Sequence, residues 1–212
     1  MATTTHPPTR VVVVTGPPAS GKTTLARTLS ERLAIPLIAK DGIKERLYDA
    51  FGSGDREWSR WLGRATYPLI YHFLEAQLRV GCSVVVEGTF GPEISNAEFA
   101  ALHERWPFNA LQLYLWAPDE ILASRYEARA PERHPGHVDA SIVDEVRDGQ
   151  AAGRWQPLQL PGELLKIDTR SFEALDIEAI VSLVGQHLKP GRAEASASTW
   201  PPERRSPGTD ET

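Results

Sequence analysis

The stretch Gly16-Pro-Pro-Ala-Ser-Gly21-Lys22-Thr23 decides the fold, because it fits the pattern G-x-x-x-x-G-K-[ST] without a mismatch. A run of four valines within residues 10–15 precedes it and predicts a buried strand. Residues 22–33 follow it with apolar side chains at helical spacing and predict a helix. Amides at the start of a helix point at an anion in such a loop, and glycines let the backbone approach that anion closely. The sequence therefore predicts a strand, a phosphate-binding loop and a helix, in that order.

The residues of this loop have expected roles in holding a nucleoside triphosphate. Lys22 is expected to reach the β- and γ-phosphates, the Thr23 hydroxyl to bind Mg²⁺, and Thr24 to contact the α-phosphate. The other loop residues expected to bind the nucleotide are Gly16, Pro17, Ala19, Ser20 and Gly21. The sequence contains no N-K-x-D guanine motif, which favours ATP over GTP. We therefore expect ATP and Mg²⁺ as cofactors.

Short apolar runs alternate with helical patterns along the chain, and this alternation predicts a parallel sheet covered by helices on both faces. Strands are expected at residues 10–15, 36–39, 83–87, 110–116 and 164–167. Helices are expected at residues 22–33, 41–51, 57–80, 94–106, 120–129, 141–150 and 172–188, with Pro68 kinking or splitting the third. The predicted fold is a three-layer α/β/α P-loop NTPase fold with a five-stranded parallel sheet and a helical lid.

Composition divides the chain into a folded middle and two polar ends. Residues 1–9 and 190–212 are poor in large apolar side chains, so we expect a disordered lead and a disordered tail around one domain at residues 10–189. The formal net charge of -5 gives no overall positive field that would attract nucleic acid, although an acidic protein can still carry a local basic groove. A single cysteine and no membrane-spanning apolar run predict a cytoplasmic location.

Two carboxylates are expected at the ends of predicted strands. Asp41 follows the second strand and Glu87 ends the third, and the carboxyl ends of parallel strands form the ligand crevice. Asp41 is expected to accept a proton from a substrate hydroxyl. Glu87 is expected to orient the acceptor or to hold Mg²⁺, directly or through water, and Asp41 is a second candidate for Mg²⁺ through water. The alternatives are a helix N-cap for Asp41 and a surface position for Glu87.

Arginines gather after the fourth predicted strand, in a segment of about residues 118–138 that we expect to form a lid over the triphosphate. Arg125 and Arg129 share one face of a predicted helix and are expected to stabilise charge as the phosphate bond breaks. Arg125 is also expected to bind the nucleotide, and Arg133 the acceptor. The alternative is a solvated basic face. His134 and His137 follow without a cysteine or third ligand, which disfavours zinc.

These features resemble, in order and spacing, the small P-loop kinases often described as AAA-type predicted kinases. That group is similar to polynucleotide kinases, zeta toxins, chloramphenicol phosphotransferases and gluconate or shikimate kinases. The resemblance covers residues 10–188 and implies a sheet ordered 2-3-1-4-5 and transfer of the ATP γ-phosphate to a hydroxyl. In two places the chain departs from this group. Lys44 stands where polynucleotide kinases have an arginine for the acceptor phosphate, and the run from Arg133 to His137 matches none of these relatives.

The segment of the chain between the second and third predicted strands, residues 52–80, is expected to cover the acceptor. The residues singled out for binding the acceptor are Asp41, Lys44, Arg60, Glu87, Thr89 and Arg133. Residues 56–73 are rich in aromatic side chains and carry arginines four residues apart. A wall of this kind suits a sugar, an aminoglycoside or a nucleoside-like acceptor, although aromatic side chains at helical spacing are also typical of a core. The favoured function is a kinase for a small-molecule hydroxyl. A polynucleotide 5′-hydroxyl kinase and an ATP-binding regulatory module without transferase activity remain the alternatives.

Overall fold

A computed structural model of the chain describes residues 9–137, 143–147, 149 and 153–189. Its strands form one parallel sheet in the order β2-β3-β1-β4-β5, which confirms the predicted topology. They are β1 (Thr9–Thr15), β2 (Leu37–Ala39), β3 (Val84–Glu87), β4 (Phe108–Trp116) and β5 (Gly162–Asp168). The valine-rich β1 is central and pairs with β3 on one side and β4 on the other. The phosphate-binding loop, which follows β1, therefore lies at the end of the central strand of the sheet.

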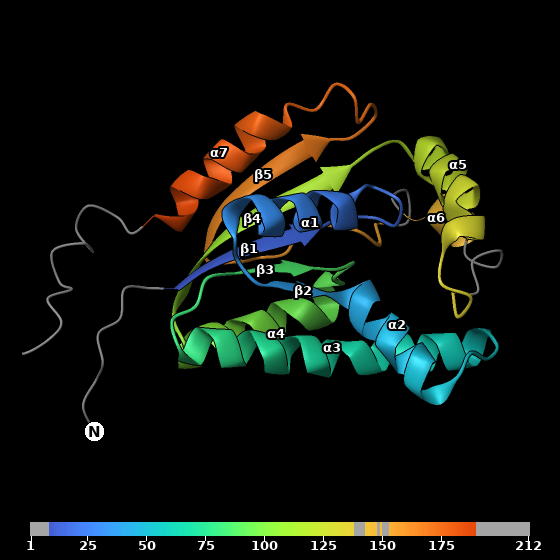
Figure 1. The fold of residues 1–212 in the computed structure, drawn as a ribbon, viewed down its shortest axis with the longest axis horizontal. Helices are drawn as coiled ribbons and strands as arrows, with labels where there is room; N and C mark the ends of the chain where they lie inside the picture. Colours follow the sequence, from blue (N-terminus) through green and yellow to red (C-terminus); the bar gives the residue numbers. More distant parts are fainter. Residues whose placement is uncertain (1–8, 138–142, 148, 150–152, 190–212) are drawn as a thin grey trace, which may run out of the picture.

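Helices cover both faces of the sheet, which confirms the predicted three layers (Figure 1). One face carries α1 (Lys22–Leu33) and α7 (Ile177–Leu188), and the other carries α3 (Arg56–Arg79) and α4 (Pro92–Arg105). Beyond the carboxyl ends of the strands lie α2 (Lys40–Phe51), α5 (Asp119–Arg129), the short η1 (Ala130–Glu132) and α6 (Val143–Arg147). No helix in the described part of the chain is long and apolar enough to cross a membrane.

Successive side chains of β1 point to opposite faces of the sheet and so contribute to the core on both faces. Val11 and Val13 pack with the apolar side chains of α3 and α4, whereas Val12 and Val14 pack with those of α1 and α7. All four side chains are fully buried. Burying both faces of a strand is the reason that an unbroken apolar run, rather than an alternating one, marks a central parallel strand. The observed strand begins at Thr9, one residue before the predicted domain start at residue 10.

Pro68 does not split α3, which runs unbroken from Arg56 to Arg79. Proline removes one backbone hydrogen bond, to the carbonyl of the residue four positions earlier. Here that residue is Arg64, which is exposed, so water can satisfy the carbonyl. The Asp55 side chain caps the start of the helix by accepting a hydrogen bond from the amide of Trp58 at 2.9 Å. The proline therefore weakens the helix locally without ending it.

The last helix begins at Ile177 rather than at the predicted residue 172. Asp176 caps it by accepting a hydrogen bond from the Ala179 amide at 2.9 Å, so residues 172–176 form a turn instead. This turn places Phe172 beside the phosphate-binding loop, where its ring would overlap a Cβ atom added at Gly21. The other described elements begin and end within one or two residues of their predicted bounds, except for α6, whose surroundings lie partly outside the described residues.

Replacing Gly16 by alanine is expected to lower the free energy of unfolding by about 1–3 kcal/mol. Gly16 has a φ of 140°, and an added Cβ would lie 2.1 Å from the Leu115 carbonyl oxygen, which belongs to the rigid strand β4. Urea unfolding measures the change. Gly185→Ala is the control with the opposite sign, because that helical position has room for a methyl group, and alanine there is expected to add about 0.5–1 kcal/mol. Equal midpoints for the two variants would contradict the strain at Gly16.

Candidate active site

The phosphate-binding loop presents an uncapped helix start to the pocket. Gly21 occupies the N-cap position of α1 with a φ of 87°, and as a glycine it has no side chain to accept a hydrogen bond from the first amides of the helix. Lys22 is buried, and its Nζ donates to the Pro17 carbonyl oxygen at 2.6 Å within the loop. An uncapped helix start with an adjacent lysine is suited to an anion such as a phosphate.

Two buried polar atoms around the loop lack hydrogen-bond partners among the described residues. They are the Ser20 hydroxyl oxygen and Oε2 of Glu87. The Thr23 side chain lies near enough to Glu87 to lower the pKa of its carboxyl, so the hydroxyl and the carboxylate expected to hold Mg²⁺ line the pocket together. Buried polar atoms are nearly always paired, and unpaired ones point to a missing polar partner. The donor set of hydroxyl and carboxylate oxygens therefore fits Mg²⁺ and a triphosphate.

A polar pocket of about 310 Å³ joins the loop to the ends of β2 and β3. The pocket is lined by Pro18 and by eleven residues with predicted roles. These eleven are Ala19, Gly21, Lys22, Thr23, Thr24, Asp41, Lys44, Glu87, Thr89, Arg129 and Arg133. His137 of the lid also lines it. Gly16, Pro17 and Ser20 are buried and do not line the pocket. The exposed Arg60 lies outside the lining too, so its expected contact with the acceptor stays a prediction.

Residues without a predicted role complete the pocket wall. They are Lys40, Ser59, Tyr67, Gly88 and Tyr126. Lys40 could have been found from its position beside Asp41 at the end of a strand. Ser59 carries no such signal, because only the packing of α3 against α2 brings it to the pocket. The Tyr67 hydroxyl donates to the Thr89 carbonyl oxygen at 2.6 Å, which fixes the loop after β3 against α3.

Asp41 does not cap α2, so the N-cap alternative is wrong. The helix begins at Lys40, and the cap position belongs to Ala39, which makes no side-chain bond to the helix. One Asp41 carboxylate oxygen, Oδ1, lies 3.6 Å from Nζ of Lys40, and the other, Oδ2, lies 3.1 Å from Nη2 of Arg133. Burial alone would raise the pKa of Asp41, but the positive charges of Lys40, Arg133 and Lys22 outweigh it and hold the pKa well below its usual value. Asp41 is therefore ionised across the physiological range.

Glu87 and Lys22 respond to burial in opposite ways. Burial raises the pKa of the Glu87 carboxyl, against the opposing effect of the Lys22 charge, because a buried carboxylate loses its hydration. Burial likewise lowers the pKa of the Lys22 ammonium, against the opposing charges of Glu87 and Asp41. Two charged groups are therefore held in the pocket at a cost in solvation. A bound cation beside Glu87 and a bound anion beside Lys22 would offset that cost.

Lys44 forms a buried cluster at the end of the pocket where α2 meets α3. Its Nζ donates to the Ser59 hydroxyl oxygen at 3.0 Å and lies 5.3 Å from the centre of the Tyr48 ring. The Tyr48 hydroxyl donates to the same Ser59 oxygen at 2.6 Å. The lysine is therefore held in one place, as a residue that orients a polar acceptor must be.

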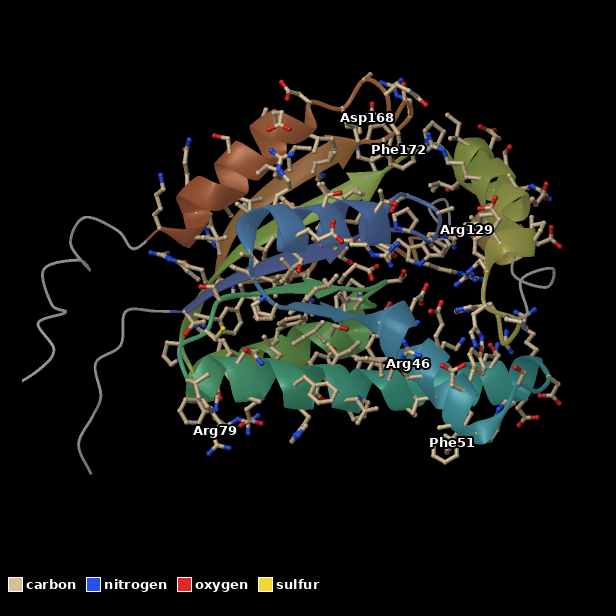
Figure 2. The ribbon with its side chains drawn as sticks, in the orientation of Figure 1. Arg46, Phe51, Arg79, Arg129, Asp168 and Phe172 are labelled. Atoms are coloured by element: carbon tan, nitrogen blue, oxygen red, sulfur yellow. The ribbon has the colours of Figure 1, made fainter. Side chains whose placement is uncertain are left out.

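The lid arginines do not share one role. Figure 2 shows Arg129 and Phe172 at the end of the sheet where the strands finish, and Arg129 lines the pocket. Arg125 does not line it. Its guanidinium donates to the Thr169 carbonyl oxygen at 2.7 Å and to the Arg170 carbonyl oxygen at 3.0 Å, and lies 4.4 Å from the centre of the Phe172 ring. Arg125 and Phe172 thus form a flat wall beside the start of α1.

The lid histidines bind helix α2 rather than forming a cluster with further metal-binding side chains. His134 lies 3.1 Å from Asp49, and His137 lies 3.3 Å from Glu45. In residues 9–137, 143–147, 149 and 153–189, no three His, Cys, Asp or Glu side chains are arranged to hold a metal ion. A magnesium site of one carboxylate, Glu87, and the Thr23 hydroxyl is consistent with this, because Mg²⁺ usually takes its other ligands from phosphate and water.

Comparison with known proteins places the fold among those of kinases. A family model described as an AAA domain matches residues 11–152. A crystal structure from Chloroflexus aurantiacus, provisionally described as a kinase, has a TM-score of 0.79 and 37% identity, covering 87% of this chain and all of that one. A cytidylate kinase from Pyrobaculum neutrophilum is 28% identical over 79% of this chain and 81% of its own length. A sugar kinase from Janibacter sp. HTCC2649 shares the fold, with a TM-score of 0.53 and 19% identity over 88% of this chain and 98% of its own.

Proposed function

Because the chain belongs to this AAA-domain family of P-loop kinases, we propose that it transfers the γ-phosphate of ATP to a hydroxyl of a small polar acceptor, such as a sugar, an antibiotic or a nucleoside-like compound. One observation carries the proposal. The ionised carboxylate of Asp41 lines the same pocket as Lys22 of the phosphate-binding loop. A carboxylate at that place can orient a hydroxyl and accept its proton.

The Asp41 carboxylate favours an alcohol over a phosphate as the acceptor. An acceptor phosphate is already an anion, needs no base, and would be repelled by a carboxylate. The low pKa of Asp41 does not exclude the role of base. Phosphoryl transfer passes through a loose transition state, so the hydroxyl needs orientation first and loses its proton late.

The dimensions of the pocket favour a small acceptor. Its volume of about 310 Å³ is at the lower end of the range for small-molecule sites, and the phosphate-binding loop occupies one side of it. The acceptor end offers Lys40, Lys44, Ser59 and Thr89, which are hydrogen-bonding groups rather than an apolar surface. A compound with several hydroxyl groups fits this chemistry better than an apolar alcohol.

Five residues of the pocket have a part in the proposed step. Asp41 accepts the proton of the acceptor hydroxyl as the hydroxyl oxygen bonds to the γ-phosphorus. The bond from that phosphorus to the bridging oxygen breaks, ADP keeps the electron pair, and the proton passes from Asp41 to solvent. Lys22 and Arg129 stabilise the charge on the transferring group. Thr23 and Glu87 would hold Mg²⁺, which neutralises phosphate charge when it is bound.

The wall formed by Arg125 and Phe172 is proposed to receive the adenine base. A guanidinium stacked on an aromatic ring offers a flat surface beside the loop that holds the phosphates. In this role Arg125 binds the nucleotide, whereas Arg129 alone of the two remains placed to stabilise the transferring charge. Phe172→Ala is expected to raise the KM for ATP about fivefold and leave the KM for the acceptor within twofold, measured by steady-state kinetics. Equal effects on both constants would contradict this assignment.

Incubation with γ-labelled ATP, Mg²⁺ and separate pools of acceptors tests the proposal. The pools are sugars, aminoglycosides, nucleosides, 5′-hydroxyl oligonucleotides and nucleoside monophosphates. Label in a sugar, aminoglycoside or nucleoside pool supports the proposal, and recovery of a phosphate ester establishes the hydroxyl. Label in the oligonucleotide pool makes the chain a polynucleotide kinase. Tight ATP binding with no label in any pool makes it an ATP-binding regulatory module, and either result overturns the proposal.

A nucleoside monophosphate is the second candidate acceptor. The observation that favours it is the similarity to the cytidylate kinase of Pyrobaculum neutrophilum. The cations Lys40, Lys44 and Arg133 around the pocket would attract such an acceptor. Formation of a labelled nucleoside diphosphate in the monophosphate pool, unchanged by Asp41→Asn, would establish this second function and remove the role of Asp41 as a base.

A further inference from the structure

Residues 133–137, here named the lid tip, dock against one face of helix α2. Acidic residues four positions apart share a helix face, and three of them on α2 each meet a different cationic or imidazole side chain of the lid tip. The contacts join Arg133 to Asp41 at 3.1 Å, His137 to Glu45 at 3.3 Å and His134 to Asp49 at 3.1 Å. The lid tip therefore matches α2 over two helical turns.

His137 links Glu45 on α2 to Arg133 in the pocket. Nη2 of Arg133 lies 2.9 Å from Nδ1 of His137, and a guanidinium can only donate, so Nδ1 accepts. The proton of a neutral His137 is then on Nε2, which donates to Oε1 of Glu45. Glu45 thus fixes the tautomer of His137, and His137 fixes the guanidinium that holds Asp41.

Shape as well as charge joins the two elements. The Tyr48 ring stacks on the His134 ring at 5.5 Å between centres and meets the His137 ring edge-on at 5.7 Å. Gly136 crosses the same tyrosine so closely that an added Cβ would lie 2.4 Å from the ring. Tyr48 in turn donates to Ser59 of the acceptor pocket. Only a glycine fits at position 136 in this arrangement.

We propose that His137 and Glu45 are positioning residues that hold the Arg133 guanidinium against Asp41, and that docking of the lid tip on α2 completes the acceptor end of the pocket. The proposal rests on the proposed function for the role of Asp41, but not for the docking itself. Glu45 does not line the pocket, so it acts through His137 and Arg133 rather than on a substrate. His137 is almost fully buried, with 4% of its side chain exposed, as a residue held between two partners must be.

A double-mutant cycle tests the positioning role. The measurement is the slow hydrolysis of Mg·ATP by the full-length chain, with water as the acceptor. Glu45→Ala and Arg133→Ala are each expected to lower kcat about tenfold while the KM for ATP stays within twofold. The double variant should be no slower than Arg133→Ala, because Glu45 acts only through Arg133. A hundredfold loss in the double variant, which independent effects would give, overturns the proposal.

A conservative variant separates positioning from general damage. Glu45→Gln keeps an oxygen that can accept from Nε2 of His137, so its kcat is expected to stay within about threefold of the wild type. Glu132→Ala, an exposed acid of the same lid, is the matched control and should leave kcat unchanged. A loss in Glu45→Gln as large as in Glu45→Ala would contradict the hydrogen-bonded relay.

Hydrogen exchange tests the docking without any activity. The His137 amide donates to the His134 carbonyl oxygen at 2.9 Å within the lid tip. In Gly136→Ala and Glu45→Ala this amide is expected to exchange at least tenfold faster, with no change in α1 and α4. Unchanged exchange in both variants overturns the docking. Accelerated exchange in a chain that transfers phosphate to none of the tested acceptors would uphold the docking and refute the proposed function alone.

Discussion

Asp41→Asn is expected to lower kcat for phosphoryl transfer by roughly 10²–10⁴, because the amide can no longer accept the proton of the acceptor hydroxyl. The affinity for Mg·ATP should stay within about threefold, since Asp41 belongs neither to the loop after β1 nor to the wall of Arg125 and Phe172, which are proposed to bind the nucleotide. Lowering the pH from 7 to 5 should not protonate Asp41, so titration of Asp41 should not lower the wild-type rate over this range. Its pKa lies well below the usual value, so the carboxylate stays ionised over that range.

The variant also changes the lid, so its control must separate the two effects. Asp41→Asn replaces the charged partner of Arg133 but keeps an oxygen that can accept from the guanidinium. Hydrogen exchange in the lid tip should therefore change little while kcat falls. Asp144→Asn, which removes a charge from an exposed side chain of α6, serves as the neutral control. Full transfer activity in Asp41→Asn would show that another group accepts the proton.

Lys22→Met is expected to abolish nucleotide-dependent stabilisation and to lower transfer by about 10³. A ligand at one hundred times its Kd stabilises the folded state by about 2.7 kcal/mol, and this gain should disappear when the ammonium group is lost. The variant without nucleotide should remain folded, because methionine fills the space of the lysine stem and removes a buried charge. Thermal unfolding with and without Mg·ATP measures the difference.

Lys166→Met is the matched control for that experiment, because Lys166 is exposed on β5 and lies outside the pocket. It should keep the full shift in unfolding temperature. An equal shift in Lys22→Met and in the wild type would mean that ATP binds elsewhere. Loss of the shift together with loss of transfer would support the assignment of the loop.

The fold could be predicted because its signals are local. The valines of β1, the glycines of the loop and the apolar spacing of α1 lie within about 25 consecutive residues, and they place the phosphate site at the centre of the sheet. Asp41 and Glu87 could be found for a related reason. Each follows a strand directly, and strand ends meet at one edge of a parallel sheet. The start of α7 was harder to locate. Phe172 fits a helix equally well, but the helix begins after Asp176, whose side chain caps it.

The lid and the acceptor wall depend on distant contacts, and their details could not be predicted. Arg133 and Asp41 are 92 positions apart in sequence, and no local pattern indicates which arginine reaches which acid. The four-residue spacing of Arg125 and Arg129 correctly put both on one helix. It did not reveal that the turn after β5 binds the first of them through backbone carbonyls. Ser59 reaches the pocket only through the packing of α3 on α2.

The phosphate-binding loop and Asp41, which lie in the same pocket, follow different strands of the sheet. The phosphate-binding loop follows β1, which has a neighbouring strand on each side, whereas Asp41 follows β2, a three-residue strand at the edge with one neighbour. Neighbouring strands constrain the start of the loop after β1 on both sides, whereas β2 has a neighbouring strand only in β3. The arrangement is modular. In the proposed function, substitutions of the pocket residues Lys44, Ser59 and Tyr67 are expected to alter the choice of acceptor while the phosphate-binding loop stays intact.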